Sequence, residues 1–117
     1  GLPALSLPSM IGFHTAFNND DNPEFAFAQQ VVAFGRPGDV LLGISTSGNS
    51  SNIVHAARAA QAMELPVISL TGENGGRLAP VADCAIKAPS QQTPRIQELH
   101  LPIYHALCQV VEDSLFS

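Results

Sequence analysis

Residues 39–52 constrain the fold more than any other part of the chain, because they join an apolar stretch, a loop of hydroxyls and an Ala-rich segment. Residues 40–44 form a continuous apolar run without polar alternation, which is typical of a strand buried on both faces. The Ala-rich segment predicts a closely packed helix at about residues 53–63. A strand that leads directly into a helix is the repeating unit of parallel α/β sheets.

The rest of the chain continues this alternation of strand and helix. Asn22 or Asp21 is positioned to cap a helix that Gly35 ends, and Thr93 to cap the last helix. That last helix is apolar nearly all round, so we expect it to be buried, here between subunits. The other predicted elements are strands at residues 2–7, 66–70 and 83–88, a long loop at residues 8–22, and helical segments at about residues 24–34, 77–81 and 94–115. Together they predict a doubly wound parallel sheet with right-handed crossovers.

Length, charge and cysteine usage limit the partners and the compartment. A chain of 117 residues suits one domain, spanning residues 1–117. The net charge of -5 argues against nucleic acid and anionic membranes as partners. No apolar run is as long as a membrane span. Cys84 and Cys108 lack metal-site spacing, so we expect buried thiols on a strand and a helix, in the reducing cytoplasm.

The loop at residues 45–52 has the composition of an anion site. Its hydroxyl donors are Ser45, Thr46, Ser47 and Ser50, and they precede the unpaired amides of a helix N-terminus. Gly48 permits close approach or a positive φ angle. The loop lacks the lysine of a P-loop, which indicates a phosphate monoester, such as a sugar phosphate, held by neutral donors. The alternative is an ordinary turn followed by an N-cap, because the same residue types favour both.

Three ordered motifs extend this interpretation to a family. They are the segment Gly-Arg-Pro-Gly-Asp-Val-Leu-Leu-Gly-Ile-Ser-Thr-Ser-Gly-Asn-Ser at residues 35–50, the Leu-Thr-Gly-x-x-Gly-Gly pattern at residues 70–76, and Arg-Ile-Gln-Glu-Leu-His at residues 95–100. With them the chain resembles the sugar isomerase (SIS) domain, and more narrowly the phosphoheptose isomerases. The resemblance implies a flavodoxin-like three-layer α/β/α sandwich and a homotetramer. It also implies conversion of sedoheptulose 7-phosphate to a heptose 7-phosphate aldose.

The resemblance also assigns roles to individual residues. The phosphate cradle of the family corresponds to Ser45, Thr46, Ser47 and Ser50. The substrate-contacting Asn-Asp pair corresponds to Asn19 and Asp20, the substrate-binding glutamine to Gln97, and the catalytic histidine to His105. In zinc-containing members, Gln97 and His105 are also the positions of two metal ligands.

The proposed chemistry explains the choice of His105. An aldose–ketose shift needs a base for a carbon-bound proton and an acid or metal for the developing enediolate. A neutral histidine titrates near the operating pH and can bind zinc. The alternative for His105 is a hydrogen-bonded histidine buried in a helix interface. We expect His14, His55 and His100 to be loop or surface residues.

The family's first strand, Gly-rich turn and following helix have no counterpart in residues 1–117, so the first βα unit is missing. That helix carries the glutamate base and a His and Glu pair of zinc ligands. We therefore expect this chain to be a partial SIS domain that does not catalyse the isomerisation alone. We also expect a gene product that begins before Gly1, and a gap in the sheet between residues 2–7 and residues 40–44.

Two other functions remain open. One is the related non-enzymatic branch that binds the bacterial replication initiator. His105 and Ser47 favour the enzyme over that branch. The other is a sugar-phosphate-sensing module of the kind fused to regulators, although this chain shows no DNA-binding element. Sugar-phosphate binding does not separate the isomerase from the sensor.

Overall fold

A three-stranded parallel sheet organises the chain, whose computed structural model describes residues 1–116. The strands are β1 (Leu41–Ile44), β2 (Val67–Thr71) and β3 (Cys84–Lys87), in the order β1-β2-β3. All pair in parallel. The parallel sheet predicted from the apolar runs is confirmed, and the strand ends agree to within one residue.

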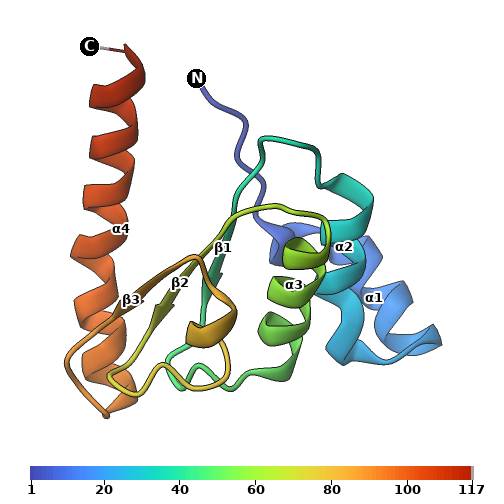
Figure 1. Cartoon of the computed structure of the whole chain (residues 1–117). Helices are drawn as coiled ribbons and strands as arrows, with labels where there is room; N and C mark the ends of the chain where they lie inside the picture. The colour runs from blue at the N-terminus through green and yellow to red at the C-terminus, as the bar shows by residue number, and fades with distance from the viewer. Residues whose placement is uncertain (117) are drawn as a thin grey trace.

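Helices cover both faces of the sheet, which gives three layers (Figure 1). One face carries three helices, and the fourth lies on the other face. The helices are α1 (Ile11–Asp20), α2 (Ala26–Phe34), α3 (Ser51–Ala62) and α4 (Thr93–Phe116), with short 3-10 turns η1 (Leu7–Ser9), η2 (Pro23–Phe25) and η3 (Ala79–Val81). The predicted α/β/α sandwich is confirmed.

The main core lies between the sheet and the α2–α3 layer. Its buried members include Val31 of α2, Val54 and Ala57 of α3, and Val67 of β2. The small alanines of α3 let its backbone approach the sheet closely, as the Ala-rich pattern predicted. The start of the preceding helical segment is also confirmed, because the side chain of Asn22 accepts a hydrogen bond from the amide of Glu24.

The predictions for residues 2–20 are wrong. Residues 2–7 form no strand, and residues 11–20 form α1 rather than a loop. The carbonyl of Leu7 is bonded by His14 and Gln30 instead of by a neighbouring strand. Within α1, stacking of Phe13 on Phe17 at i,i+4 spacing offsets the turn-forming Asn and Asp residues. The predicted gap in the sheet therefore has no counterpart here, and β1 is an edge strand.

The second face of the sheet is less covered than predicted. Leu42 and Ile44 are 44% and 45% exposed, because only the α2–α3 layer covers β1. Likewise α4 buries only Ile96 and His100 fully, so its predicted burial is not observed within one chain.

The thiols of Cys84 and Cys108 are exposed rather than buried. Cys84 pairs with Ile68 of β2, which in turn pairs with Leu42 of β1, so Cys84 lies on the same face of the sheet as Leu42. The helix α4 begins at Thr93, one residue before its predicted start, so Thr93 is the first helical residue rather than the residue that precedes the helix.

The end of α3 stores backbone strain at Glu64. Its φ angle of 59° lies in the left-handed region, where the amide of the next residue, Leu65, bonds back to the carbonyl of Ala60 at 2.9 Å. This geometry is normally occupied by glycine. Glu64→Gly should therefore raise the free energy of unfolding by about 1 kcal/mol in urea titrations. The matched control Gln61→Gly, inside the helix, should lower it by about 1 kcal/mol. Equal losses for both variants would contradict this assignment.

Candidate functional site

The hydroxyls of the loop after β1 form a connected group. Ser45 is 5% exposed, and its Oγ lies 3.0 Å from the Oγ of Ser50 and accepts a hydrogen bond from the amide of Gly48. The Oγ of Ser47 accepts from the amide of Asn49. These bonds hold a tight turn at the carboxyl end of the sheet, where parallel α/β folds bind ligands.

The amides at the start of α3 remain available for a ligand. Ser50 stands in the N-cap position, but its side chain makes no capping bond because it lies beside Ser45 instead. Within residues 1–116, the amides of Ser51 and Asn52 have no acceptor. Free amides at a helix N-terminus attract an anion. The geometry thus fits an anion cradle better than a simple N-cap.

A second loop, residues 72–76 after β2, packs directly against this cradle. Gly48 has a φ angle of +70°, and a Cβ there would overlap the carbonyl oxygen of Gly75. The carbonyl of Gly48 accepts from the amide of Leu78, and the carbonyl of Thr46 accepts from the amide of Gly72. The cradle therefore keeps its shape through backbone contacts between two loops.

The first turns of α4 are fixed beside the cradle. Ile96 packs against Gly72, and Gln97 follows it as an exposed residue. His100 is 2% exposed, and its Nε2 donates to the carbonyl of Thr71 at 2.8 Å. The expectation that His100 is a loop or surface residue is wrong, since it anchors α4 to the end of β2. Its position four residues after Ile96, on the same helix face, is the signal that could have revealed this.

His105 lies away from the cradle of its own chain. It is exposed, and five residues at 100° each place it about 140° round α4 from the buried His100. The buried-interface alternative for His105 is thus not observed within one chain. Gln97 follows Ile96 in the turn of α4 that lies beside the second loop, whereas His105 lies about 12 Å farther along the helix and about 80° round from Gln97.

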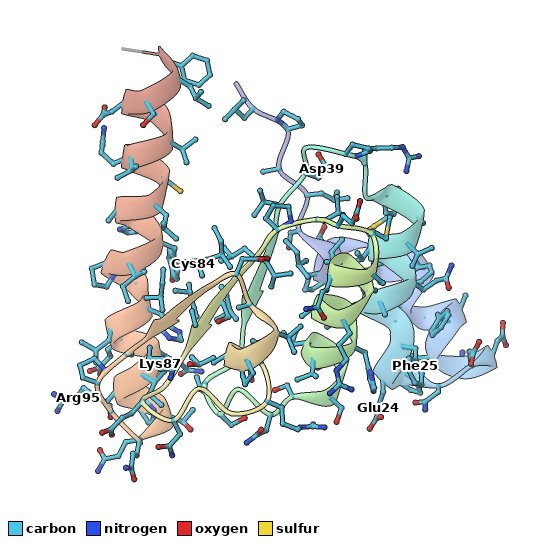
Figure 2. The ribbon with its side chains drawn as sticks, viewed as in Figure 1. Glu24, Phe25, Asp39, Cys84, Lys87 and Arg95 are labelled. Carbon is cyan, nitrogen blue, oxygen red and sulfur yellow. The ribbon has the colours of Figure 1, made fainter. Side chains whose placement is uncertain are left out.

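Asn19 and Asp20 are exposed at the end of α1, the outermost helix of its layer (Figure 1). No contact joins them to residues 45–52 among the described residues. The chain approaches the cradle just after them, where Pro23 and Glu24 line a hollow of about 260 Å³ together with Ser51 and Asn52. Figure 2 shows Glu24 at this end of the molecule.

The two other histidines also differ from simple surface residues. His14 lies on α1, half-buried, with its Nε2 bonded to the carbonyl of Leu7. His55 on α3 stacks on Phe25 at 4.4 Å and lies 3.9 Å from the carboxylate of Glu24. Both fix α1 and η2 against the α2–α3 layer rather than belonging to the cradle.

Gln97 and His105, the two residues that the resemblance assigns to zinc, do not complete a metal centre. They lie eight residues apart on α4, about 80° round and about 12 Å along the helix, with Pro102 between them. Across residues 1–116, no group of three His, Cys, Asp or Glu side chains gathers closely enough to hold a metal ion. Zinc takes three or four protein ligands, so this pair alone does not fit it.

Two cations near the cradle were missed from the sequence. Arg77 donates from its guanidinium to the carbonyl of Asn49 at 2.9 Å and to the hydroxyl of Ser51 at 3.3 Å. The side chain of Lys87, the last residue of β3, lies beside Gly75. Figure 2 shows Lys87 at the carboxyl end of the sheet. Both residues lie far from the cradle in sequence, so loop composition alone could not reveal them.

Comparisons with known proteins agree with this geometry. A family model described as the SIS domain matches residues 2–72. The phosphoheptose isomerase of Rhodospirillum rubrum is 47% identical over 116 residues, which cover 99% of this chain and 62% of that protein. The phosphoheptose isomerase of Aneurinibacillus thermoaerophilus is 45% identical over 116 residues, covering 99% and 59%.

The structural comparison gives the same result. The phosphoheptose isomerase from Neisseria gonorrhoeae superposes with a TM-score of 0.91 at 42% identity, over 94% of this chain and 62% of that one. The chain belongs to the SIS domain family. Within that family it is a relative of the phosphoheptose isomerases, and it spans 59% to 62% of the length of the two curated relatives above.

Replacing Gly48 tests the contact between the two loops. Gly48→Ala forces a Cβ into the carbonyl of Gly75, whereas Gly38→Ala also has a positive φ angle, of 94°, but meets open space. We expect Gly48→Ala to lower the free energy of unfolding by at least about 1 kcal/mol more than Gly38→Ala, because the overlap adds to the φ strain. Denaturant unfolding of both variants measures this difference. Equal destabilisation would show that the loops can separate freely.

Proposed function

We propose that this chain forms the sugar-phosphate-binding part of an aldose–ketose isomerase that acts on sedoheptulose 7-phosphate. The observation that carries the proposal is the cradle after β1, with connected hydroxyls and free amides at the start of α3. The similarity to phosphoheptose isomerases supports the choice of a seven-carbon sugar phosphate.

In this proposal the phosphate monoester lies on the N-terminus of α3. Its oxygens accept hydrogen bonds from the hydroxyls of Ser45, Thr46, Ser47 and Ser50. The backbone amides of Ser51 and Asn52 add two uncharged donors. Asn19, Asp20 and Gln97 bind hydroxyls of the sugar, because amide and carboxylate groups match them as donors and acceptors. Binding at the phosphate fixes the distance from the cradle to the reacting carbons.

The reaction moves a proton between neighbouring carbons. A base removes a proton from C1 of the ketose, and the electron pair forms the C1–C2 double bond of an enediolate while the C2 carbonyl oxygen becomes charged. Delivery of a proton to C2 and transfer of the C1 hydroxyl proton to the charged C2 oxygen then give the aldose, with its carbonyl at C1 and a hydroxyl at C2. We assign His105 to one of these proton transfers, because an imidazole nitrogen can accept a proton and donate it again. The second acid–base group is not assigned to a residue of this chain.

The orientation of His105 supports a site shared between copies. It faces away from the cradle of its own chain, so its partner cradle belongs to a second copy in a homo-oligomer, proposed here as a tetramer. Seven of the fourteen exposed large apolar side chains within residues 1–116 lie on β1 and α4, where they are available for such an assembly. They are Leu42, Ile44, Leu101, Val110, Val111, Leu115 and Phe116. A zinc ion would need donors beyond Gln97 and His105, and the steps above use none.

A cytoplasmic location also remains a proposal, supported by the two free thiols. No helix within residues 1–116 is long and apolar enough to cross a bilayer. The relatives named above are phosphoheptose isomerases, which favours the isomerase over the replication-initiator partner and over the sugar-phosphate sensor.

Kinetics of two single variants test the assigned roles. In the intact protein with sedoheptulose 7-phosphate, Ser50→Ala should raise KM about tenfold or more, because a charge-assisted hydrogen bond is lost. His105→Ala should lower kcat by about a hundredfold or more, because a proton transfer loses its group. Ser114→Ala, on the exposed end of α4, serves as the control. Absence of aldose product from the unaltered protein would refute the isomerase, and a full kcat for His105→Ala would refute its role.

Disruption of the apolar surface of α4 tests the assembly. Val110→Glu combined with Val111→Glu adds two charges to exposed positions, so the fold should persist while the subunits separate. Sedimentation should then give the mass of one subunit, whereas the control Glu112→Gln should keep the larger mass. An unchanged oligomer in the double variant would contradict an interface through α4.

A further inference from the structure

Three hydrogen bonds hold Arg77 at the entrance of the cradle, two from its guanidinium and one from its backbone amide. Its Nη2 donates to the carbonyl of Asn49 and to the hydroxyl of Ser51. The backbone amide of Arg77 donates to the side-chain oxygen of Asn49 at 3.0 Å. Together these bonds fix the turn that leads into α3, directly beside the free amides of its first residues.

The same guanidinium keeps donors for a ligand. Within residues 1–116, Nη1 and Nε of Arg77 make no hydrogen bond or ion pair, and the side chain is exposed. A guanidinium presents five N–H donors in a planar fork that matches phosphate oxygens. An arginine fixed through one nitrogen is therefore preorganised to bind an anion through the others.

The surroundings of Arg77 contain charges of both signs. Although the chain carries a net charge of -5, three of its five cations, Arg77, Lys87 and Arg95, lie at or after the carboxyl ends of the strands. The acidic side chains there include Glu73 in the second loop and Glu24, which lines the hollow beside Ser51 and Asn52. Figure 2 shows Lys87 and Arg95 at that end. Arg95 lies 3.7 Å from the carboxylate of Glu98, which offsets part of its charge. Arg77 is in no such ion pair among the described residues.

We propose that Arg77 is the cation of the phosphate site, with Nη2 holding the Asn49–Ser51 turn and Nη1 donating to an oxygen of the substrate phosphate. This inference rests on the proposed function and revises one prediction from the sequence, in which neutral donors alone hold the phosphate. Arginine suits both tasks at once, because a lysine ammonium is a point charge that cannot hold the loop and the phosphate together.

The proposal separates binding from turnover. The phosphate is remote from the reacting carbons and keeps its charge throughout the reaction. Arg77 therefore stabilises substrate and transition state equally, and its loss should raise KM with little change in kcat. The loss of Arg77 should also weaken the binding of sedoheptulose 7-phosphate and leave the binding of unphosphorylated sedoheptulose unchanged.

The test compares Arg77→Gln, Arg77→Lys and the control Arg58→Gln in the intact protein. Arg58 is exposed on α3, seven residues beyond its start, so its loss removes the same charge at a distance of about 10 Å. We expect Arg77→Gln to raise KM and Kd for sedoheptulose 7-phosphate about tenfold to a hundredfold, with kcat within about threefold. Arg77→Lys should recover part of that affinity, and Arg58→Gln should match the unaltered protein.

Amide hydrogen exchange without ligand gives a second, function-independent readout. The amides of Gly48 and Leu78 are bonded within and between the two loops, so Arg77→Gln should speed their exchange while Arg58→Gln should not. Equal affinities for Arg77→Gln and Arg58→Gln, in a protein that binds the substrate, would overturn the inference and leave the proposed function intact. Unchanged exchange at both amides in Arg77→Gln would overturn the loop-holding role of Arg77, whether or not the protein binds sedoheptulose 7-phosphate. Failure of the unaltered protein to bind sedoheptulose 7-phosphate would refute the proposed function instead.

Discussion

The contact between Gly48 and Gly75 joins the loops that follow β1 and β2, and the candidate site depends on it. No side chain fits between these two backbones, so the loops meet directly and exchange hydrogen bonds at Thr46 and Leu78. Each loop alone would be an exposed, mobile connection. Joined, they form a rigid rim that holds the hydroxyls of the cradle beside the free amides of α3.

The same contact links elements that are distant in sequence. The second loop begins at Gly72, directly after Thr71, whose carbonyl accepts the bond from His100 of α4. It ends at Arg77, whose guanidinium reaches back to the cradle. One rigid rim thus fixes both the start of α4, with Gln97, and the charge at the cradle entrance. The bond from the buried His100 to Thr71 is therefore what joins α4 to the rim.

The two faces of the sheet differ in how much of their apolar surface a single chain covers. The α2–α3 layer closes one face with a core of small and branched side chains. On the other face α4 buries little beyond Ile96 and His100, so apolar side chains of β1 and α4 remain exposed. Exposed apolar surface that extends over two elements usually marks an interface. This asymmetry and the outward position of His105 both support an assembled active site.

Sequence patterns predicted the elements whose periodicity was strong. The three strands, the Ala-rich α3 and the hydroxyl loop followed from runs of residues with one character. The patterns failed at two places for different reasons. At α1 the stacking of Phe13 on Phe17 is a local contact, but the nearby Asn and Asp residues favoured a loop. At His100 a contact distant in sequence decides the outcome, because its bond to Thr71 depends on where β2 ends. Arg77 lies 28 residues from Asn49, although its place directly after a Gly-Gly turn was a usable signal.

Amide chemical shifts of the cradle test the central claim most directly. Titration of the intact, ¹⁵N-labelled protein with sedoheptulose 7-phosphate should shift the unpaired amides of Ser51 and Asn52 the most, because the phosphate supplies the acceptors that these amides lack. Unphosphorylated sedoheptulose should leave both amides unchanged. Equal shifts with the two sugars, or shifts confined to residues outside the cradle, would contradict the account.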